Sequence, residues 1–178
     1  GPGSPLCDGN RLYENRWPAP FSRAESAYGL GAGSWGWGMA VLDVDLDGGA
    51  DIVQTTGYGS PYTDGADARV LELFAPFAED NLRLFERVDG QFTDRSLNRG
   101  VLSTTQSRTV LNLDLDGDGD DDLVVSSFAA PVEVWENETD PAARHLSVVV
   151  LGSNCGPAAA AHIELESGAF RRSREITR

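Results

Sequence analysis

The sequence has no lysine, and all 14 of its basic residues are arginine. Its 178 residues include 28 aspartates and glutamates, which gives a formal net charge of -14. A protein that binds nucleic acid needs clustered basic side chains to displace the counterions of the phosphate backbone. The charge balance therefore argues against a nucleic-acid partner.

Long hydrophobic segments are also missing. A helix that crosses a bilayer needs about 20 consecutive, mainly apolar residues, and the uninterrupted apolar runs here are much shorter. We therefore expect a soluble chain without membrane insertion. Hydrophobic residues still make up 40% of the sequence, which is enough to bury a core.

Cysteine is scarce, with only Cys7 and Cys155 near opposite ends of the chain. A disulfide could join them in an oxidising compartment, and two free thiols or partners in missing sequence are the alternatives. No Cys/His spacing typical of zinc is present. Residues 1–4 (Gly-Pro-Gly-Ser) resemble the remnant of a cleaved expression tag.

Motifs of known catalytic sites are absent as well. His145 and His162 are the only histidines, and we expect both to be structural. The sequence contains no nucleophile elbow, phosphate-binding loop or dinucleotide-binding fingerprint. A carboxylate pair for glycoside hydrolysis could still be formed among the many acids. We nevertheless predict that the chain is not an enzyme.

Aspartates recur at alternate positions in two segments that lie 71 residues apart, Asp43–Asp51 and Asp114–Asp122. In both, Asp occupies the first, third, fifth and ninth positions, with glycine between them. Calcium takes six to eight oxygen ligands at about 2.3–2.6 Å, and such a loop can direct four carboxylates inward. Without a cation, these charges would repel one another strongly. The pattern predicts two Ca²⁺ sites with a structural role.

Acidic Asp/Gly runs also occur as solvated turns or disordered segments. The identical spacing of two copies, each between apolar runs, favours metal binding. An EF-hand requires a bidentate Glu at its twelfth position, where this chain has Gln54 and Val125. The two loops are therefore predicted to belong to another class of calcium site.

The flanking segments show the short apolar patterns of strands rather than helical periodicity. These segments are 37–42 and 52–53 around the first loop, and 109–113 and 123–125 around the second. Polar and apolar residues alternate at period two in three further segments, which predicts hairpins: 10–22, 81–94 and 132–138. The repeated unit is strand, Asp loop, strand, strand, turn, strand. Repeated four-stranded units are typical of a β-propeller, so we predict an all-β fold.

Residues 10–13 (Asn-Arg-Leu-Tyr), residues 35–40 and both Asp loops resemble the FG-GAP or VCBS repeats of integrin-like β-propellers. More narrowly, they are similar to bacterial homologues of the cartilage acidic protein group, whose last blades lead into a small ASPIC/UnbV domain. The resemblance implies that residues 5–144 form about two to two and a half blades. It also implies that residues 145–178 form a partial ASPIC/UnbV-like β segment, although residues 156–160 depart from the family pattern.

The resemblance also implies a ligand set for each loop: the side chains at positions one, three, five and nine and the backbone carbonyl at position seven. In the first loop these are Asp43, Asp45, Asp47, Gly49 and Asp51. In the second loop they are Asp114, Asp116, Asp118, Asp120 and Asp122. Asp121 is expected to face solvent, and residues 64–67 to form a loop inserted between strands.

Aromatic residues gather around the first loop in sequence, namely Trp35, Trp37, Tyr58 and Tyr62. Flat rings present a large rigid area, so they could form a platform for a carbohydrate or peptide. The alternative is that Trp35 and Trp37 pack between neighbouring blades. Trp17 and Trp135 are expected in the core.

The predicted blades are fewer than those of a closed propeller, so an open stack leaves strand edges and apolar faces unpaired. Either the chain is a fragment of a longer protein, or copies complete one another by self-association or strand exchange. We expect an extracellular, cell-surface or periplasmic interaction or adhesion module that binds a protein or carbohydrate. The alternative is part of a secreted polysaccharide lyase or hydrolase.

Overall fold

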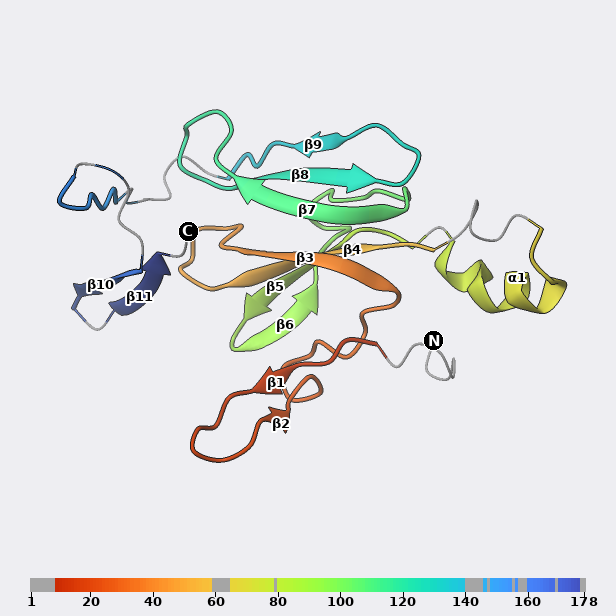
Figure 1. Ribbon diagram of the computed structural model, residues 1–178, viewed down its shortest axis with the longest axis horizontal. Helices are drawn as coiled ribbons and strands as arrows, with labels where there is room; N and C mark the ends of the chain where they lie inside the picture. Colours follow the sequence, from red (N-terminus) through yellow and green to blue (C-terminus); the bar gives the residue numbers. More distant parts are fainter. Residues whose placement is uncertain are drawn as a thin grey trace. The chain divides into compact units, whose positions relative to one another are not determined.

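The computed structural model describes residues 9–58, 65–78, 80–139, 146, 148–154, 156, 160–168 and 170–176. The chain divides into two compact units, Gly1–His145 and Leu146–Arg178. The described residues are mostly β, in four small antiparallel sheets (Figure 1). The predicted all-β class is confirmed at this level. The possible Cys7–Cys155 disulfide, His145, Tyr62 and the Gly-Pro-Gly-Ser remnant involve positions outside the described residues.

The first sheet follows the predicted unit of strand, Asp loop, strand, strand, turn and strand. Its strands, in spatial order, are β3 (Gly36–Leu42), β4 (Asp51–Thr56), β5 (Arg83–Val88) and β6 (Gln91–Asp94). Asp89 and Gly90 form the turn between β5 and β6 with φ of 50° and 80°. Two consecutive left-handed residues match the twist of a tight hairpin.

The second sheet repeats only part of this unit among the described residues. It contains β7 (Ser107–Leu113), β8 (Asp122–Ser127) and β9 (Glu133–Trp135) in that order. The hairpin expected within residues 132–138 contributes only β9 there. The second sheet therefore ends in an edge strand where the first continues into β6.

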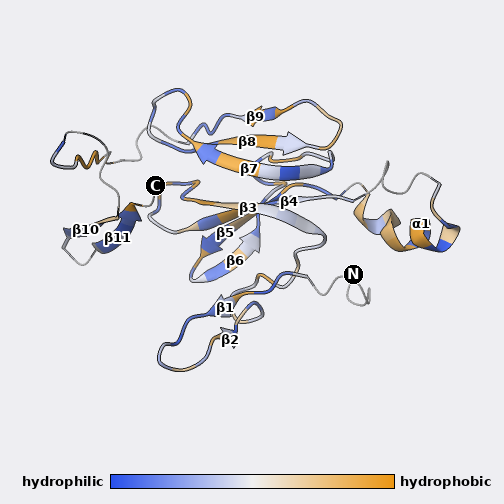
Figure 2. Cartoon of the chain, viewed as in Figure 1, coloured by the Kyte–Doolittle hydropathy of each residue, from blue (hydrophilic) through white to orange (hydrophobic). Residues whose placement is uncertain are grey.

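The two sheets lie face to face, and the hydrophobic core of the first unit lies between them (Figures 1 and 2). Successive side chains of a strand point to opposite faces of the sheet, so every second residue of each strand faces this layer. The buried residues are Ala40, Leu42, Val44, Val53, Leu82, Leu84, Val101, Val110, Leu123 and Val125. Trp135 packs against this cluster, as expected for a core residue.

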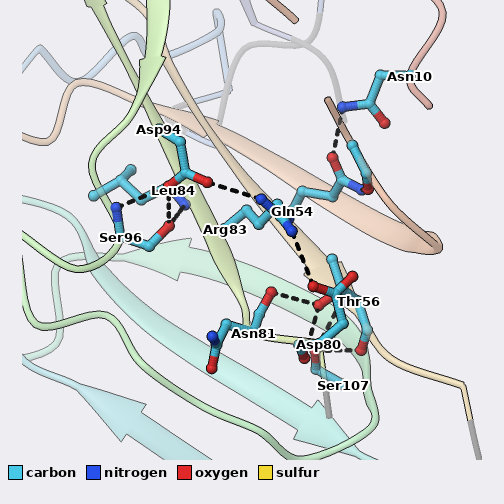
Figure 3. Close-up of polar contacts among 11 residues, drawn as sticks. Asn10, Gln54, Thr56, Asp80, Asn81, Arg83, Leu84, Asp94, Ser96 and Ser107 are labelled. Carbon is cyan, nitrogen blue, oxygen red and sulfur yellow. Dashed lines mark hydrogen bonds and ion pairs between the residues drawn. The ribbon is translucent and has the colours of Figure 1, made fainter. Parts of the chain in front are cut away.

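Polar contacts join the two sheets at the end opposite the Asp loops (Figure 3). Ser107 and Thr56 are fully buried, and the Ser107 Oγ accepts a hydrogen bond from the Thr56 amide at 3.1 Å and donates to its carbonyl at 3.1 Å. The Thr56 hydroxyl donates to the Asn81 carbonyl at 2.5 Å. These bonds satisfy backbone groups that burial would otherwise leave unpaired.

The N-terminal part of the first unit forms a short hairpin of β1 (Tyr13–Glu14) and β2 (Ser22–Arg23). The hairpin predicted over residues 10–22 is therefore confirmed. Trp17 lies in its connection and is exposed, so its expected place in the core is wrong. Among the described strands, β1 and β2 pair only with each other.

A short helix is the main departure from the sequence-based expectations. The helix α1 (Ala68–Phe74) continues into a 3-10 turn, η1 (Ala75–Phe77). Asp67, expected in a loop, caps the helix by accepting a hydrogen bond from the Arg69 amide at 2.8 Å, a common N-terminal signal. Within the described residues, no helix is both long and apolar enough to cross a membrane.

The described residues of the second unit form one antiparallel hairpin, β10 (Ala161–Ser167) paired with β11 (Phe170–Ile176). This hairpin lies within residues 145–178, for which a β segment was expected. His162 is exposed in β10, and its Nε2 lies 3.4 Å from Glu164 Oε1. This contact gives His162 a local partner on the surface of the hairpin.

Candidate metal centres

Each Asp loop connects the first two strands of its sheet. The first lies between β3 and β4, and the second between β7 and β8. Both place the same loop positions in the left-handed region of φ: Leu46 (55°) and Gly117 (84°) at position four, Gly48 (84°) and Gly119 (100°) at position six. The two loops therefore share a backbone conformation as well as a spacing of acids.

The ninth aspartate closes each loop through both of its carboxylate oxygens. Asp51 accepts hydrogen bonds from the amides of Val44 at 3.0 Å and Arg87 at 2.8 Å. Asp122 accepts equivalent bonds from Leu115 and Asn137, both at 2.8 Å. Both aspartates are buried, and their bonds join each loop to another part of its unit, β5 in the first and the segment after β9 in the second.

The remaining aspartates are positioned by amides of their own loop. Asp43 accepts a bond from the Gly48 amide at 2.9 Å, and Asp114 from the Gly117 amide at 2.7 Å. Asp at positions three and five accept from the amide two residues later, in the manner of an Asx turn. Asp45 accepts from the Asp47 amide and Asp47 from the Gly49 amide; in the second loop, Asp116 accepts from the Asp118 amide and Asp118 from the Asp120 amide.

Three carboxylates converge in each loop. Oxygens of Asp43, Asp45 and Asp51 all lie within 4.8 Å of one another, and so do those of Asp114, Asp116 and Asp122. Two ligands of one calcium ion are separated by at most about 5.2 Å, which is twice the longest Ca–O distance. Each group can therefore hold a metal ion.

The structure does not bring every predicted ligand into these groups. The carboxylates of Asp47 and Asp118 lie outside the two groups that the described residues form. Both face the amide two residues later along the chain. Their role as ligands stays a prediction, as do the carbonyl contributions of Gly49 and Asp120.

The charge and burial of the first loop disfavour ionised carboxylates without a cation. Burial, together with the nearby carboxylates, raises the pKa of Asp43 and of Asp51. The Oδ1 of Asp43 is buried and has no hydrogen-bond partner among the described residues. A buried oxygen without a donor costs about 1–3 kcal/mol, and a bound cation would remove this cost.

The side chain of Asp120 was not identified from the sequence, where only its carbonyl was considered. It is buried, and its Oδ1 has no partner among the described residues. Desolvation, followed by the charge of Asp118, raises its pKa to about 6. The equivalent position in the first loop is Gly49. An aspartate in place of this glycine at position seven was the sequence signal that the side chain of Asp120 could take part in the second site.

Asp121 does not face solvent freely, contrary to expectation. It is half-buried and accepts a hydrogen bond from the Asn112 side chain at 2.6 Å. Asn112 belongs to β7, the strand that precedes the second loop. Asp121 therefore holds the end of the loop against its own sheet.

Among the described contacts, a basic side chain forms an ion pair with an aspartate of the first loop but not with one of the second. Arg99 NH2 is 3.7 Å from Asp45 Oδ2, and the same guanidinium also pairs with Glu86. An adjacent positive charge reduces the attraction of a carboxylate group for a cation. The two loops therefore differ: the first has a neighbouring arginine, and the second has an additional buried carboxylate.

Three of the four aromatic residues, Trp35, Trp37 and Tyr58, form a cluster where β3 begins and β4 ends. The rings of Trp35 and Tyr58 lie 4.9 Å apart, and those of Trp37 and Tyr58 are stacked at 6.1 Å. Arg108 of β7 lies over the Trp37 ring at 4.3 Å, and the Trp37 indole donates to the Gly57 carbonyl at 2.7 Å. Trp37 thus joins β3 to β7, which favours the alternative of packing between sheets.

The chemistry of the described sites is that of oxygen donors on a β scaffold. Three carboxylates converge in each of two equivalent loops. No protein-family model matches this sequence, and no curated protein matches it either.

Proposed function

We propose that this chain is a calcium-stabilised β-repeat protein of the FG-GAP/VCBS type that its loops resemble, acting as an extracellular interaction or adhesion module. The observation that carries the proposal is the convergence of three carboxylates in each of two equivalent loops. The donors are all oxygen, which suits a hard cation. Calcium tolerates such irregular sets of six to eight oxygens better than magnesium, which demands octahedral geometry.

The proposed role of each ion is to stabilise a connection between strands. The ion would neutralise carboxylates whose ionisation is otherwise opposed by burial and by like charge. It would thereby hold the β3–β4 and β7–β8 loops in their folded conformation. A ligand that binds only the folded state stabilises it by about 4 kcal/mol at a thousandfold excess over its dissociation constant. Millimolar extracellular calcium suits this role.

Calorimetric titration of the chelator-treated protein with CaCl₂ tests the proposal. We expect two bound ions per chain and a melting temperature that rises by many degrees with calcium. An unchanged melting temperature in EDTA would remove the structural role of the ions. Titration with MgCl₂ should give much weaker binding, because magnesium demands near-octahedral geometry and gives up its waters reluctantly.

Single substitutions assign the two sites. Asp45→Ala and Asp116→Ala each remove a carboxylate from one converging group, so each variant should bind one ion instead of two. Glu72→Ala removes an exposed acid of α1 and serves as the matched control, which should still bind two. Two ions bound by either Asp variant would show that the ligand assignment is wrong.

A further inference from the structure

The second sheet exposes apolar positions that are buried in the first. Residues 71 apart occupy equivalent places in the two sheets, because each sheet has the same register relative to its Asp loop. In the first sheet Ala40 is 8% exposed, and Leu42 and Val44 are also buried. The equivalent residues of the second sheet are Leu111, Leu113 and Leu115; Leu111 is 59% exposed, and the other two are exposed as well.

The same contrast extends across the strands. In the first sheet, Ala40 pairs with Val53, which pairs with Leu84, and this whole row is buried. In the second sheet, Leu111 pairs with Val124, which pairs with Val134, and Val134 is 61% exposed. We call the surface of Leu111, Leu113, Leu115 and Val134 the open face.

The chain itself shows what covers such a face. The first sheet is covered by the opposite side of the second sheet, through Val110 of β7 and Val125 of β8. The equivalent of Val110 in the first sheet is Met39, which is 60% exposed, and its neighbour Val41 on the same side is exposed too. We call Met39 and Val41 the leading face.

The surroundings of the leading face can accept protruding side chains. A cavity of about 560 Å³ lies beside it, between the N-terminal segment and β3. Its lining mixes apolar side chains such as Leu12, Met39 and Ile52 with polar ones such as Asn10 and Gln54. The N-terminal segment already covers Gln54, the strand partner of Met39, which donates to the Gly33 carbonyl at 2.5 Å and accepts from the Asn10 side chain at 2.7 Å. Met39 and Val41 of β3 are therefore the part of this side that is open to leucines of an open face.

We propose that a second copy of this chain places its leading face on the open face and so continues the stacking of sheets from one chain to the next. The contact reproduces the one between β3 and β7 within the chain, with β3 of the second copy in the place that β7 has inside the first (Figure 1). Contiguous exposed apolar residues mark such association surfaces. Because two different faces meet, the contact is head-to-tail and gives a ring or an open chain of copies.

Sedimentation velocity of the whole chain, measured over a concentration series up to about 100 µM, tests this proposal. We expect assemblies larger than a monomer that grow with concentration. Leu111→Glu on the open face and Met39→Glu on the leading face should each leave monomers. Leu97→Glu changes an exposed leucine outside both faces and should associate as the unmodified chain does.

Mixing the two variants distinguishes this arrangement from a symmetric dimer. The Leu111→Glu chain keeps an intact leading face, and the Met39→Glu chain keeps an intact open face. An equimolar mixture should therefore form heterodimers and stop there. A symmetric contact through the open face alone would leave Met39→Glu fully associated and would overturn the proposal, as would a monomeric unmodified chain.

A variant that fails to fold must not be mistaken for one that fails to associate. Circular dichroism melting of each variant identifies this case, and Val134→Glu on edge strand β9 is the second open-face variant. It should also be monomeric and recover association with the Met39→Glu chain. Folded Leu111→Glu or Val134→Glu chains that associate as the unmodified protein does would overturn the proposal. Leu115 belongs to the second Asp loop, so the series is run both in CaCl₂ and in EDTA. Monomers in both solutions would overturn this proposal, whereas association in CaCl₂ that is lost in EDTA would support it and assign the loss to the metal sites.

Discussion

Asn137 and Val44 lie 93 residues apart in the sequence, yet the Asn137 side-chain amide donates to the Val44 carbonyl at 3.0 Å. The backbone amide of Asn137 donates to Asp122 in the second loop. Val44 in turn donates its own amide to Asp51 in the first loop. A continuous series of hydrogen bonds therefore connects the closing aspartates of the two loops.

Replacing Asn137 with Ala should destabilise the first unit. The substitution removes the bond to Val44, whereas the single hydroxyl proton of Thr139, which lies 2.9 Å from Asn137 Oδ1, can still be donated to the Val44 carbonyl at 2.8 Å. One lost hydrogen bond corresponds to about 0.5–1.5 kcal/mol of unfolding free energy. Urea denaturation measures this loss, and Glu136→Ala, an exposed neighbour, should remain within about 0.5 kcal/mol of the unmodified protein.

The second loop should bind calcium more tightly than the first. Asp120 adds a buried carboxylate there, whereas Arg99 lies beside Asp45 in the first loop. Titration of Asp45→Ala reports the second site alone, and titration of Asp116→Ala reports the first. Adding Asp120→Asn to the Asp45→Ala chain should weaken the remaining site by about tenfold, since one charge in such a site contributes on the order of 1 kcal/mol or more. Equal affinities of the two single-site chains would contradict this prediction.

The calcium-free protein should be more stable at pH 5 than at pH 8. The pKa of Asp120 is raised to about 6 in the folded state from 3.8, and the pKa values of Asp43 and Asp51 are also raised. A raised folded-state pKa stabilises the fold below the unfolded pKa, and this stability is lost as the pH rises through the folded pKa.

Thermal melting in EDTA across this pH range measures the effect, and Asp120→Asn should reduce it. Protons compete with the cation for the same oxygens, so the rise in melting temperature caused by calcium should be larger at pH 8 than at pH 5. A calcium-free melting temperature that increases steadily from pH 5 to pH 8 would count against these assignments.

Gly117→Ala should lower stability through backbone strain alone. Gly117 has φ of 84°, and a Cβ there would meet no heavy atom within 4 Å. A left-handed non-glycine residue costs about 1–2 kcal/mol, which differential scanning calorimetry can detect. Gly31→Ala is the matched control, because its site is equally open and its φ is not positive.

The equivalent position of the first loop allows the reverse experiment. Leu46 has φ of 55°, so Leu46→Gly relieves strain but adds about 0.5–1 kcal/mol of chain entropy to the cost of folding. The melting temperature should change little or rise slightly. A loss as large as that of Gly117→Ala would show that Leu46 contributes packing rather than strain.

Features with a local cause were predicted well from the sequence. The strands beside both Asp loops and the hairpin turn at Asp89–Gly90 follow from alternation and glycine, which act over a few residues. The helix α1 was missed, although Asp67 carries a capping signal, because a seven-residue segment shows little periodicity. The expectation for Trp17 was wrong because a large aromatic side chain suggests burial. In the structure it lies in the connection of the short β1–β2 hairpin and is exposed.

The sequence by itself determined the positions of the two acidic loops, their shared spacing and the strands that they join, since each depends on neighbours along the chain. Only the tertiary structure decided that three carboxylates converge in each loop and that Asp120 is buried. It also decided that Asn137 reaches Val44 and that Ala40 is covered while Leu111 is not. These outcomes depend on how one sheet lies on another, and contacts between residues far apart in the chain leave no periodic signal in the sequence.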